Sequence, residues 1–325
     1  MRTTPPTPAE LDEITRTCDA IRARLSHVLS GKPEVVRTTL AVLLAEGHLL
    51  VEDVPGVGKT TLARALARTL RGTVGRVQFT PDLLPGDLTG MTIYRTHDAT
   101  FEFRPGPIFA NVVIGDEINR ASPKTQSALL QCMEEHQVTV DGTTHDLPRP
   151  FLVVATQNPL EMEGTYPLPE AQRDRFTACI SVGYPSADAE LEMLERRDSA
   201  DPLDELEPVT DVTTLARLVD VVHHVFAAEA VKRYAIDVVR ATRTDADVRL
   251  GASPRASVQL LRVARAVAAL GGRAYVTPDD VQALAGPVLA HRIVVSPSAR
   301  ASGRTAADVV TDVLARVPVP VPARR

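Results

Sequence analysis

The chain has 325 residues, which is long enough for two domains of ordinary size with separate hydrophobic cores. Hydrophobic residues make up 44% of it and charged residues 24%, a composition typical of folded globular proteins rather than disordered ones. The formal net charge of −5 and the aromatic content of 4%, without tryptophan, argue against a basic or base-stacking surface for nucleic acid. We therefore expect no nucleic-acid partner.

The cysteines and the N-terminus indicate where the protein works. Cys18, Cys132 and Cys179 are far apart and form no paired motif, which favours a reducing compartment and argues against disulfides or a zinc site. The N-terminal segment carries acids where a signal peptide needs an apolar core, and charged residues interrupt the apolar stretch from Val35 to Val51. We expect a cytoplasmic protein without membrane insertion.

The first elements predicted from the sequence surround a glycine-rich loop. Apolar residues recur at steps of three and four from Ala9 to Ser30, which predicts an amphipathic helix, and a second helix is predicted from Pro33 to about Glu46. The short apolar run His48–Glu52 has the length of a buried strand, and Thr61–Leu70 is predicted to be helical. Strand, glycine loop and helix in this order are the context that a phosphate-binding loop requires.

Further buried strands are predicted at Val112–Gly115 and Phe151–Thr156, separated by helical or turn-rich sequence. This alternation of strands and helices predicts a parallel sheet covered on both faces. Two hairpins are expected to be inserted into this α/β unit, one formed by Met91–Arg95 and Thr100–Phe103, the other by Val138–Val140 and Thr143–His145 around the turn Asp141-Gly142.

The character of the sequence changes after residue 184. The remaining apolar segments have helical spacing and predict helices at Ala187–Arg197, Thr213–Ala228, Ala230–Ala241, Ser257–Leu270 and Asp279–Ala290. We expect an α/β domain in residues 1–184, N-terminal helices included, followed by a small all-α domain in residues 185–312. Residues 313–325 include alternating valine and proline and are expected to form an extended or disordered tail.

The segment between the first predicted strand and the next helix has the chemistry of a phosphate-binding loop. Such a loop needs consecutive backbone N–H groups aimed at the phosphates and the positive potential of a helix N-terminus. The residues expected to hold a nucleotide are Pro55, Gly56, Val57, Gly58, Lys59, Thr60 and Thr61. The glycines permit the backbone geometry, Lys59 neutralises the outer phosphates, and the Thr60 hydroxyl is a ligand for Mg²⁺. The pattern begins with glycine, but Asp53 stands there in this chain, which leaves the conformation of the first turn open.

Polar side chains at the ends of the other two predicted strands complete the expected site. Asp116 and Glu117 follow Val112–Gly115 at its carboxyl end, where α/β sheets bind their ligands. We expect Asp116 to hold the water shell of Mg²⁺, and Glu117 to orient and deprotonate the attacking water. Asn158 follows the neighbouring strand and is expected to reach both the γ-phosphate and that water. The pattern predicts binding and hydrolysis of ATP.

Two arginines are candidates for stabilising the charge on the transferred phosphoryl group. Arg175 lies where the α/β domain ends, and Arg255 starts a helix of the second domain. A planar guanidinium pairs two phosphate oxygens and does not titrate, which suits both positions. If Arg175 acts across a subunit boundary, where such an arginine adds on the order of 10³–10⁵ to the rate, the active enzyme must be an oligomer. Arg173 is a rival for this role.

Longer segments carry a family resemblance. They are Gln78–Asp87, Asp116–Leu130, Met133–Glu135, Ala155–Pro159, Glu163–Gln172 and Asp174–Phe176. Together they resemble MoxR-type AAA+ ATPases, over roughly residues 10–295. The resemblance implies an AAA+ P-loop αβα sandwich with a parallel sheet and inserted β-hairpins, followed by a small all-α lid. It also implies a homo-oligomeric ring, usually hexameric, that uses ATP and Mg²⁺. Its implied role is chaperone-like maturation of a client complex together with a von Willebrand factor A-domain protein.

The resemblance also assigns roles by position, within these motifs, in the glycine loop and in the segment Gly251–Arg255. The Walker A residues are Lys59 and Thr60, the Walker B residues Asp116 and Glu117, the sensor 1 residue Asn158, the arginine finger Arg175 and the sensor 2 residue Arg255.

Three other functions are compatible with a nucleotide-binding core of this kind. A chelatase-type AAA+ motor subunit has a closely related core and works beside a large partner that carries the von Willebrand domain. A DNA-acting AAA+ protein needs a basic surface, and the net charge of −5 argues against one. A nucleotide-binding scaffold without catalysis is the third, and the presence of Lys59, Glu117 and Asn158 argues against it.

Overall fold

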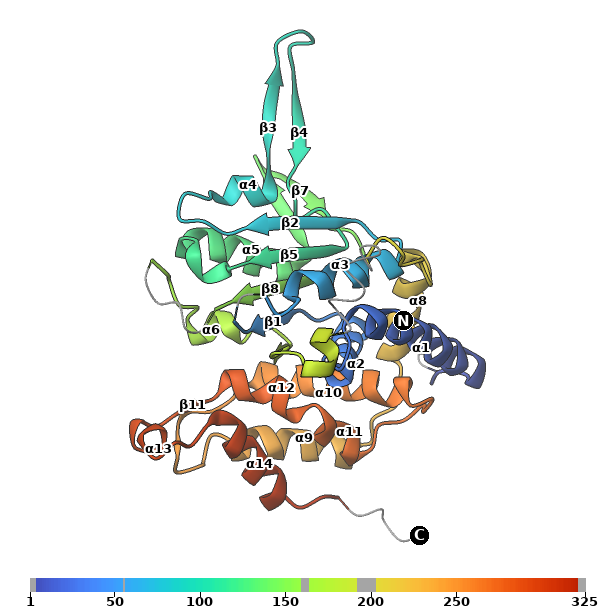
Figure 1. Ribbon diagram of the computed structural model, residues 1–325, viewed down its shortest axis with the longest axis vertical. Helices are drawn as coiled ribbons and strands as arrows, with labels where there is room; N and C mark the ends of the chain where they lie inside the picture. Colours follow the sequence, from blue (N-terminus) through green and yellow to red (C-terminus); the bar gives the residue numbers. More distant parts are fainter. Residues whose placement is uncertain (1–3, 55, 159–163, 192–202, 321–325) are drawn as a thin grey trace.

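The computed structural model describes residues 4–54, 56–158, 164–191 and 203–320. Figure 1 shows an α/β body in the middle, helices of the C-terminal part below it and a long hairpin above it. The predicted loop residue Pro55 lies outside the described residues, as does the predicted helix Ala187–Arg197 beyond residue 191. In the part of the chain that is described, no helix is long and apolar enough to cross a membrane.

Two N-terminal helices, α1 (Pro8–Val28) and α2 (Pro33–Leu44), confirm the first predictions. Thr7 and Glu10 form a capping box that satisfies backbone N–H groups which the first turn of α1 leaves unpaired. The side chains of α1 that recur at helical spacing are buried, namely Leu11, Ile14, Cys18, Ile21 and Leu25. Helix α2 is apolar on most of its surface and is therefore packed between α1 and the later helix α10 (Pro254–Leu270).

The central sheet has five parallel strands in the order β2-β5-β8-β1-β9. Their bounds are β1 Leu49–Glu52, β2 Val74–Gln78, β5 Val112–Asp116, β8 Leu152–Gln157 and β9 Ala178–Ile180. The three central strands are those predicted, because strands buried on both faces are apolar almost throughout. The two edge strands were not predicted, since β2 alternates exposed and buried residues and β9 has only three residues.

Helices cover both faces of the sheet, as expected. Helix α3 (Lys59–Thr69) packs against α1 and β5 on one face, and α5 (Pro123–Glu135) contributes to the core of the other face. Each face of the sheet has its own hydrophobic core: the first lies under α1 and α3, the second under α5. Successive strand residues point to opposite faces, so Leu49 belongs to the first core and Leu50 to the second. The first core continues without a break into the C-terminal helices.

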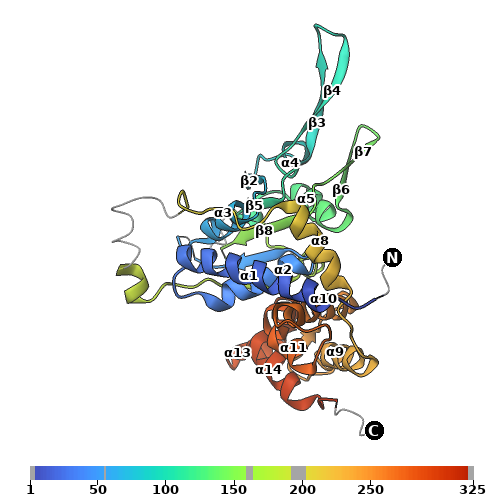
Figure 2. The same ribbon diagram turned by 90° about the vertical axis from the view of Figure 1, so that its right-hand side faces the viewer.

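Both predicted hairpins are present and project from the same end of the molecule, as Figure 2 shows. The first pairs β3 (Gly90–Arg95) with β4 (Thr100–Pro105), and the second pairs β6 (Gln137–Val140) with β7 (Thr143–Asp146). Asp141 and Gly142 have φ of 48° and 80°, as a type I′ turn requires. The ring of Phe103 stacks on His145 with centroids 4.0 Å apart, which joins the two hairpins near their bases.

The C-terminal part is mainly helical, as predicted, but it contains more elements than expected. Its helices, besides α10, are α8 (Val212–His223), α9 (Glu229–Ala241), α11 (Pro278–Ala283), α12 (Ala285–Leu289), α13 (Pro297–Ala301) and α14 (Ala306–Arg316). The single helix predicted at Asp279–Ala290 is divided at Leu284 into α11 and α12. The strands β10 (Val248–Leu250) and β11 (Val294–Val295) form a small antiparallel pair where only helices were predicted.

The predicted tail begins with helix rather than extended chain. Residues 313–316 belong to α14, which buries Val309, Val310 and Val313 against the other C-terminal helices. The valines at helical spacing outweigh the proline-rich sequence that follows them. The expectation of an extended or disordered segment from residue 313 is therefore wrong for these first residues.

A buried ion pair fastens the C-terminal helices to the segment before β9. The Arg292 side chain is 1% exposed, and its Nε donates to Oδ1 of Asp174 at 2.9 Å. Its Nη atoms also donate to the carbonyls of Asp174 at 3.1 Å, Phe176 at 2.5 Å and Thr177 at 3.3 Å. Burial lowers the pKa of Arg292 to about 10, against the opposing effect of Asp174, so the guanidinium keeps its charge at neutral pH. The contacts hold the two parts together.

Replacing Arg292 by Met keeps an unbranched side chain but removes the guanidinium from these carbonyls and from the Asp174 carboxylate, which among the described residues keeps only the hydroxyl of Ser253 as a hydrogen-bond donor. We expect the free energy of unfolding to fall by about 3–5 kcal/mol, because a buried charge loses its partner. Urea unfolding followed by circular dichroism measures the change. The matched control is Arg300→Met, at an exposed arginine of α13, with an expected change below about 0.5 kcal/mol. Equal losses in the two variants would contradict a fastening role for Arg292.

Candidate functional site

The glycine loop connects β1 to α3. Gly56 and Gly58 have φ of 86° and 89°, a left-handed region that residues with side chains rarely adopt. Gly58 is the N-cap of α3, so the unpaired N–H groups at the start of this helix point towards the loop. Val57 lies between the two glycines, and Thr61 lies in the first turn of α3. The loop has the backbone that a phosphate-binding site needs.

Asp53, at the position where glycine is usual, has a structural role that the sequence left open. It is not among the described residues with left-handed backbone. Its carboxylate accepts hydrogen bonds from Val54 N at 2.9 Å, Ser181 Oγ at 3.0 Å and Gly183 N at 2.6 Å. Burial raises the pKa of Asp53, but these hydrogen bonds outweigh it and the pKa lies below its ordinary value. Asp53 therefore ties the loop to the end of β9.

Thr60 and Asp116 meet beside Lys59. The Oγ1 of Thr60 donates to Oδ1 of Asp116 at 3.3 Å, and Thr156 Oγ1 lies 3.5 Å from the same oxygen. The Nζ of Lys59 donates to the carbonyl of Asp53 at 2.9 Å. Burial lowers the pKa of Lys59, although nearby carboxylates, Asp116 among them, oppose the shift. The site therefore has an ammonium group next to a carboxylate and a hydroxyl.

The donor atoms of this group fit Mg²⁺. A hydroxyl and a carboxylate oxygen are hard ligands, and Mg²⁺ commonly takes one or two protein ligands with phosphate oxygens and water. Thr60 and Asp116 are close enough to share such an ion directly or through water. Among the residues described, there is no cluster of three His, Cys, Asp or Glu side chains that could hold a metal without a nucleotide.

Glu117 follows β5 in a left-handed conformation, with φ of 58° and ψ of 50°. Its backbone N–H donates to Thr156 Oγ1 at 3.0 Å. Its Oε2 accepts a hydrogen bond from Gln78 Nε2 at 2.6 Å and lies 3.2 Å from Arg120 Nε. A left-handed residue with a side chain persists only where its surroundings hold it. The neighbours of Glu117 therefore fix this carboxylate at the carboxyl end of β5.

Sequence reasoning missed two residues of β2 that contact the acids. Arg76 Nε donates to Oδ2 of Asp116 at 3.0 Å, and Gln78 reaches Glu117 as described above. Side chains two residues apart on a strand share one face, and in β2 this is the exposed face. In the sequence, Arg76 and Gln78 are alternate polar residues of a short segment. This pattern indicates a contact with the acids only once β2 is known to lie beside β5.

Asn158 comes directly after β8, which lies between β5 and β1 in the sheet. The strands are parallel, so Asn158 shares the carboxyl edge of the sheet with Asp116 and with the glycine loop. It is half-buried. The three strand ends that the sequence singled out are thus neighbours.

The two predicted arginines lie together, but not with the loop. Arg175 Nη2 is 3.4 Å from Oε2 of Glu134, and Arg255 Nη2 is 2.5 Å from Oε1 of the same carboxylate. Both arginines line a cavity of about 300 Å³ between α5 and α10, together with His48 and Met133. Glu134 was not predicted to have a role, because its partners are distant in the sequence.

The direction of β1 separates this cavity from the glycine loop. The N–H of Thr177 donates to the carbonyl of His48 at 2.8 Å, directly before β1 begins, whereas the loop starts where β1 ends. A Cβ on Gly47 would lie 2.3 Å from Thr177 Oγ1, so only glycine permits this approach. Strand β1 is roughly 13 Å long at about 3.3 Å per residue. Arg175 and Arg255 therefore lie at the amino edge of the sheet, away from the loop of their own copy.

Arg173, the rival of Arg175, has a different environment. It ends the short helix α6 (Glu170–Arg173), and its Nη2 donates to Oε1 of Glu52 at 3.0 Å. The same oxygen accepts a hydrogen bond from Gln157 at 2.6 Å. Arg173 thus contacts the last residues of β1 and β8 and takes no part in the pair formed by Arg175 and Arg255.

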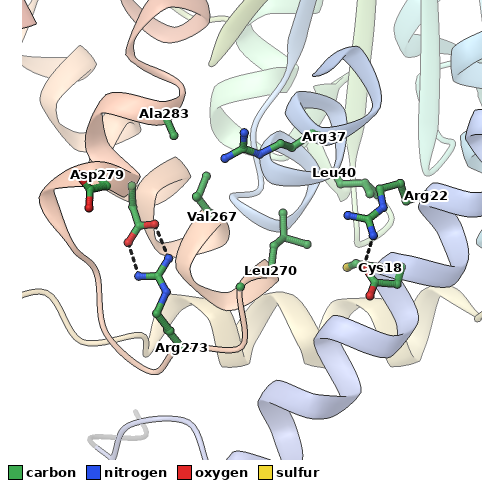
Figure 3. Close-up of a pocket in the computed structure, with 12 residues that line it drawn as sticks. Cys18, Arg22, Arg37, Leu40, Val267, Leu270, Arg273, Asp279 and Ala283 are labelled. Atoms are coloured by element: carbon green, nitrogen blue, oxygen red, sulfur yellow. Dashed lines mark hydrogen bonds and ion pairs between the residues drawn. The ribbon is translucent and has the colours of Figure 1, made fainter. Parts of the chain in front are cut away.

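A cavity of about 380 Å³ between α1, α2, α10 and α11 contains none of the predicted site residues (Figure 3). Its lining has three arginines and three aspartates, and two of the arginines pair with an aspartate of the cavity. Arg22 Nη2 lies 3.0 Å from Asp19, and Arg273 makes two hydrogen bonds to Asp280, at 2.6 and 2.7 Å. Because these charges are already balanced, a charged ligand would gain less electrostatic attraction in this cavity than at the glycine loop.

A parallel sheet with a phosphate loop after β1, acids after β5 and an asparagine after β8 is the arrangement of an AAA+ ATPase, the fold class that was predicted. Residues 48–178 match the model of the ATPase family associated with various cellular activities (AAA), and residues 240–313 match the AAA lid domain. The helices from α10 onward thus belong to the expected lid.

Comparison with individual proteins shows to which family of AAA+ ATPases the chain is similar. The chain is 50% identical over 297 residues to YeaC of Bacillus subtilis, a protein described as uncharacterised, covering 91% of this chain and 93% of that one. It is 42% identical over 305 residues to Chaperone MoxR1 of Mycobacterium tuberculosis, covering 91% and 80%. A crystal structure of a candidate ATPase from Cytophaga hutchinsonii superposes with a TM-score of 0.90 at 37% identity, covering 96% and 98%. The chain belongs to the MoxR family of AAA+ ATPases.

Restoring the usual glycine in the variant Asp53→Gly should damage the protein. The change removes the acceptor of three hydrogen bonds, and we expect the free energy of unfolding to fall by about 2–3 kcal/mol at pH 7. Because the folded pKa of Asp53 is lowered, its charge stabilises the protein above the ordinary value of 3.8, and this contribution is lost as pH falls through the folded pKa. Unfolding in urea at pH 7 and at pH 3 measures both effects. Asp53→Asn, which keeps an acceptor without the charge, should lose less; an unchanged Asp53→Gly variant would contradict the anchoring role.

Proposed function

We propose that the protein is a Mg²⁺-dependent ATPase that works as a homo-oligomeric ring, most simply a hexamer, with each hydrolysis site between two copies. The observation that supports this most strongly is the separation of the two halves of the site. Lys59 and Asp116 lie at the carboxyl edge of the sheet, whereas Arg175 lies at the amino edge. A copy that carries complementary halves on different edges can join head to tail, and such contacts form a ring when the rotation between copies closes.

ATP binds with its phosphates on the glycine loop. Residues 56–61 surround the phosphates, and Lys59 exchanges its bond to the Asp53 carbonyl for one to a phosphate oxygen. Thr60 and Asp116 hold Mg²⁺, which when bound neutralises charge on the phosphate oxygens. The burial that lowers the pKa of Lys59 makes an anionic partner more favourable for it.

Hydrolysis needs a base, an orienting group and a cation. Glu117 accepts a proton from the attacking water as the water oxygen bonds to the γ-phosphorus and the bond to the ADP oxygen breaks. Asn158, on the strand beside β5, orients that water and the γ-phosphate. Arg175 of the adjacent copy stabilises the charge that develops on the transferred group, and Arg255 of that copy assists it. The pairing of Arg173 with Glu52 supports Arg175 rather than Arg173 in this role.

The energy of hydrolysis serves a chaperone-like role, the remodelling or maturation of a client complex with a von Willebrand factor A-domain protein as partner. The name of the relative Chaperone MoxR1 supports this role. The β3–β4 hairpin gives further support, because Tyr94 and Phe101 on it are 52% and 76% exposed. Large exposed apolar side chains on a projecting element are typical of contact with another protein.

We also propose a cytoplasmic location and a boundary between the two domains near residue 184. The described chain has free cysteines, of which Cys18 and Cys132 are buried. Burial raises the pKa of both thiols to about 12, which keeps them protonated and unreactive. Such thiols behave as small apolar side chains, which fits a reducing compartment.

The variant Glu117→Gln should bind ATP but hydrolyse it at least about 10²-fold more slowly, because the amide cannot accept the proton. Steady-state phosphate release and binding of a fluorescent ATP analogue measure the two properties, each with and without Mg²⁺. Glu135→Gln, which neutralises an exposed carboxylate at the end of α5, is the control and should hydrolyse ATP at the parent rate. Hydrolysis at the parent rate by Glu117→Gln would rule out this residue as the base.

Mixed assemblies test whether the site is shared between copies. Lys59→Ala chains lack phosphate binding but keep the arginines, and Arg175→Ala chains bind ATP but lack one arginine. Each variant alone should retain less than about a hundredth of the parent rate. A mixture of equal amounts should recover hydrolysis, because some ATP then faces an intact Arg175. A mixture as inactive as its components would show that Arg175 acts in its own copy.

A further inference from the structure

Glu134 connects three elements of the amino edge through one carboxylate. It lies one residue before the end of α5, and its two oxygens contact Arg175, from the segment before β9, and Arg255, from the first turn of α10. One oxygen serves each guanidinium, at 3.4 and 2.5 Å. The carboxylate thus sets the distance between two arginines that belong to different domains.

Two guanidinium groups at this spacing repel each other unless an anion lies between them. The wall of the cavity also carries Arg262, seven residues after Arg255 and therefore on the same face of α10. Its acids are Glu46 and Glu134. With three arginines and two acids, the cavity has an excess of positive charge, which complements a phosphate and the acids at the carboxyl edge of another copy.

The side chains of Arg175, Arg255 and Glu134 are accessible to such a partner. Arg175 is 32% exposed, Arg255 35% and Glu134 45%, so the group is open to solvent in a single copy. Asp174, next to Arg175, accepts the one hydroxyl proton of Ser253, whose Oγ lies 3.0 and 2.8 Å from its two carboxylate oxygens, and this brings the start of α10 to the same segment. The backbones of both arginines are therefore fixed, and Glu134 orients the flexible ends of their side chains.

We propose that Glu134 is a positioning residue for ATP hydrolysis: it holds Arg175 and Arg255 at the spacing at which the pair meets the terminal phosphate bound by the adjacent copy. The proposal rests on the proposed function of a site shared between copies. Glu134 does not contact the nucleotide itself and acts through the two arginines.

Removal of the Glu134 charge should therefore slow the chemical step without weakening ATP binding. In Glu134→Gln we expect kcat to fall about ten- to a hundredfold, as misplaced charge-stabilising groups do, with KM for ATP within about twofold of the parent. The two arginines should also cease to act as a pair. Arg255→Ala should then cost a smaller factor in kcat in the Glu134→Gln background than in the parent, a non-additivity that a merely structural role does not produce.

Mixed assemblies test whether Glu134 acts in the copy that donates the arginines. The arginine donor is the Lys59→Ala chain and the ATP-binding chain is Arg175→Ala, and Glu134→Gln is introduced into one or the other. We expect the recovered rate to fall at least fivefold further when Glu134→Gln is in the donor than when it is in the ATP-binding chain. Glu135→Gln in the donor is the matched control and should leave the recovered rate within about twofold. Melting temperatures of the donors, expected to agree within about 3 °C, exclude a folding defect.

The outcomes separate the two proposals. Equal loss from either placement, or no loss from the donor, would overturn the role of Glu134 while the shared site stands. No recovery in the mixture that carries intact Glu134 would overturn the shared site, and the role of Glu134 with it.

Discussion

The five strands of the sheet share one direction, and this places every polar group of the site on one of two edges. Loops that follow parallel strands meet at the carboxyl edge, where the glycine loop, Asp116 and Glu117 lie together. Segments that precede strands join them at the other edge, where Thr177 approaches Gly47 closely, although the long side chain of Arg173 reaches Glu52 at the end of β1. Arg175 therefore pairs with Glu134 at the amino edge rather than with the loop of its own copy, and this separation supports the proposed shared site.

The position of the lid depends on the segment before β9, which also carries Arg175. Asp174 receives hydrogen bonds from Ser253 and from the buried Arg292, so the helices after β9 are fastened next to Arg175. Arg255 is carried to the amino edge by this contact. The junction thus fixes the position of Arg255, for which we propose a role in hydrolysis. In the described part of the chain the lid is also continuous with the core that contains α1 and α2, which makes these helices and the lid one packed unit.

The parts of the fold and site that could be predicted are those that depend on local sequence. The central strands are buried on both faces and therefore apolar, and the turn at Asp141 requires residues that tolerate positive φ. The groups that escaped prediction depend on tertiary neighbours. Gln78 contributes because β2 lies beside β5, and Glu134 because α5 ends beside two arginines that are 41 and 121 positions further along the chain. In the sequence, Asp53 is only a departure from the glycine of the loop pattern, whereas in the structure it anchors the loop to the end of β9.

The site shared between copies is tested most directly by a structure of the Glu117→Gln variant with ATP and Mg²⁺, determined by electron cryomicroscopy of the assembled protein. We predict that the γ-phosphate next to Lys59 lies within hydrogen-bond distance, about 3 Å, of Arg175 from the adjacent copy. A γ-phosphate contacted only by residues of the copy that binds it, with Arg175 remote from any nucleotide, would rule out the shared site.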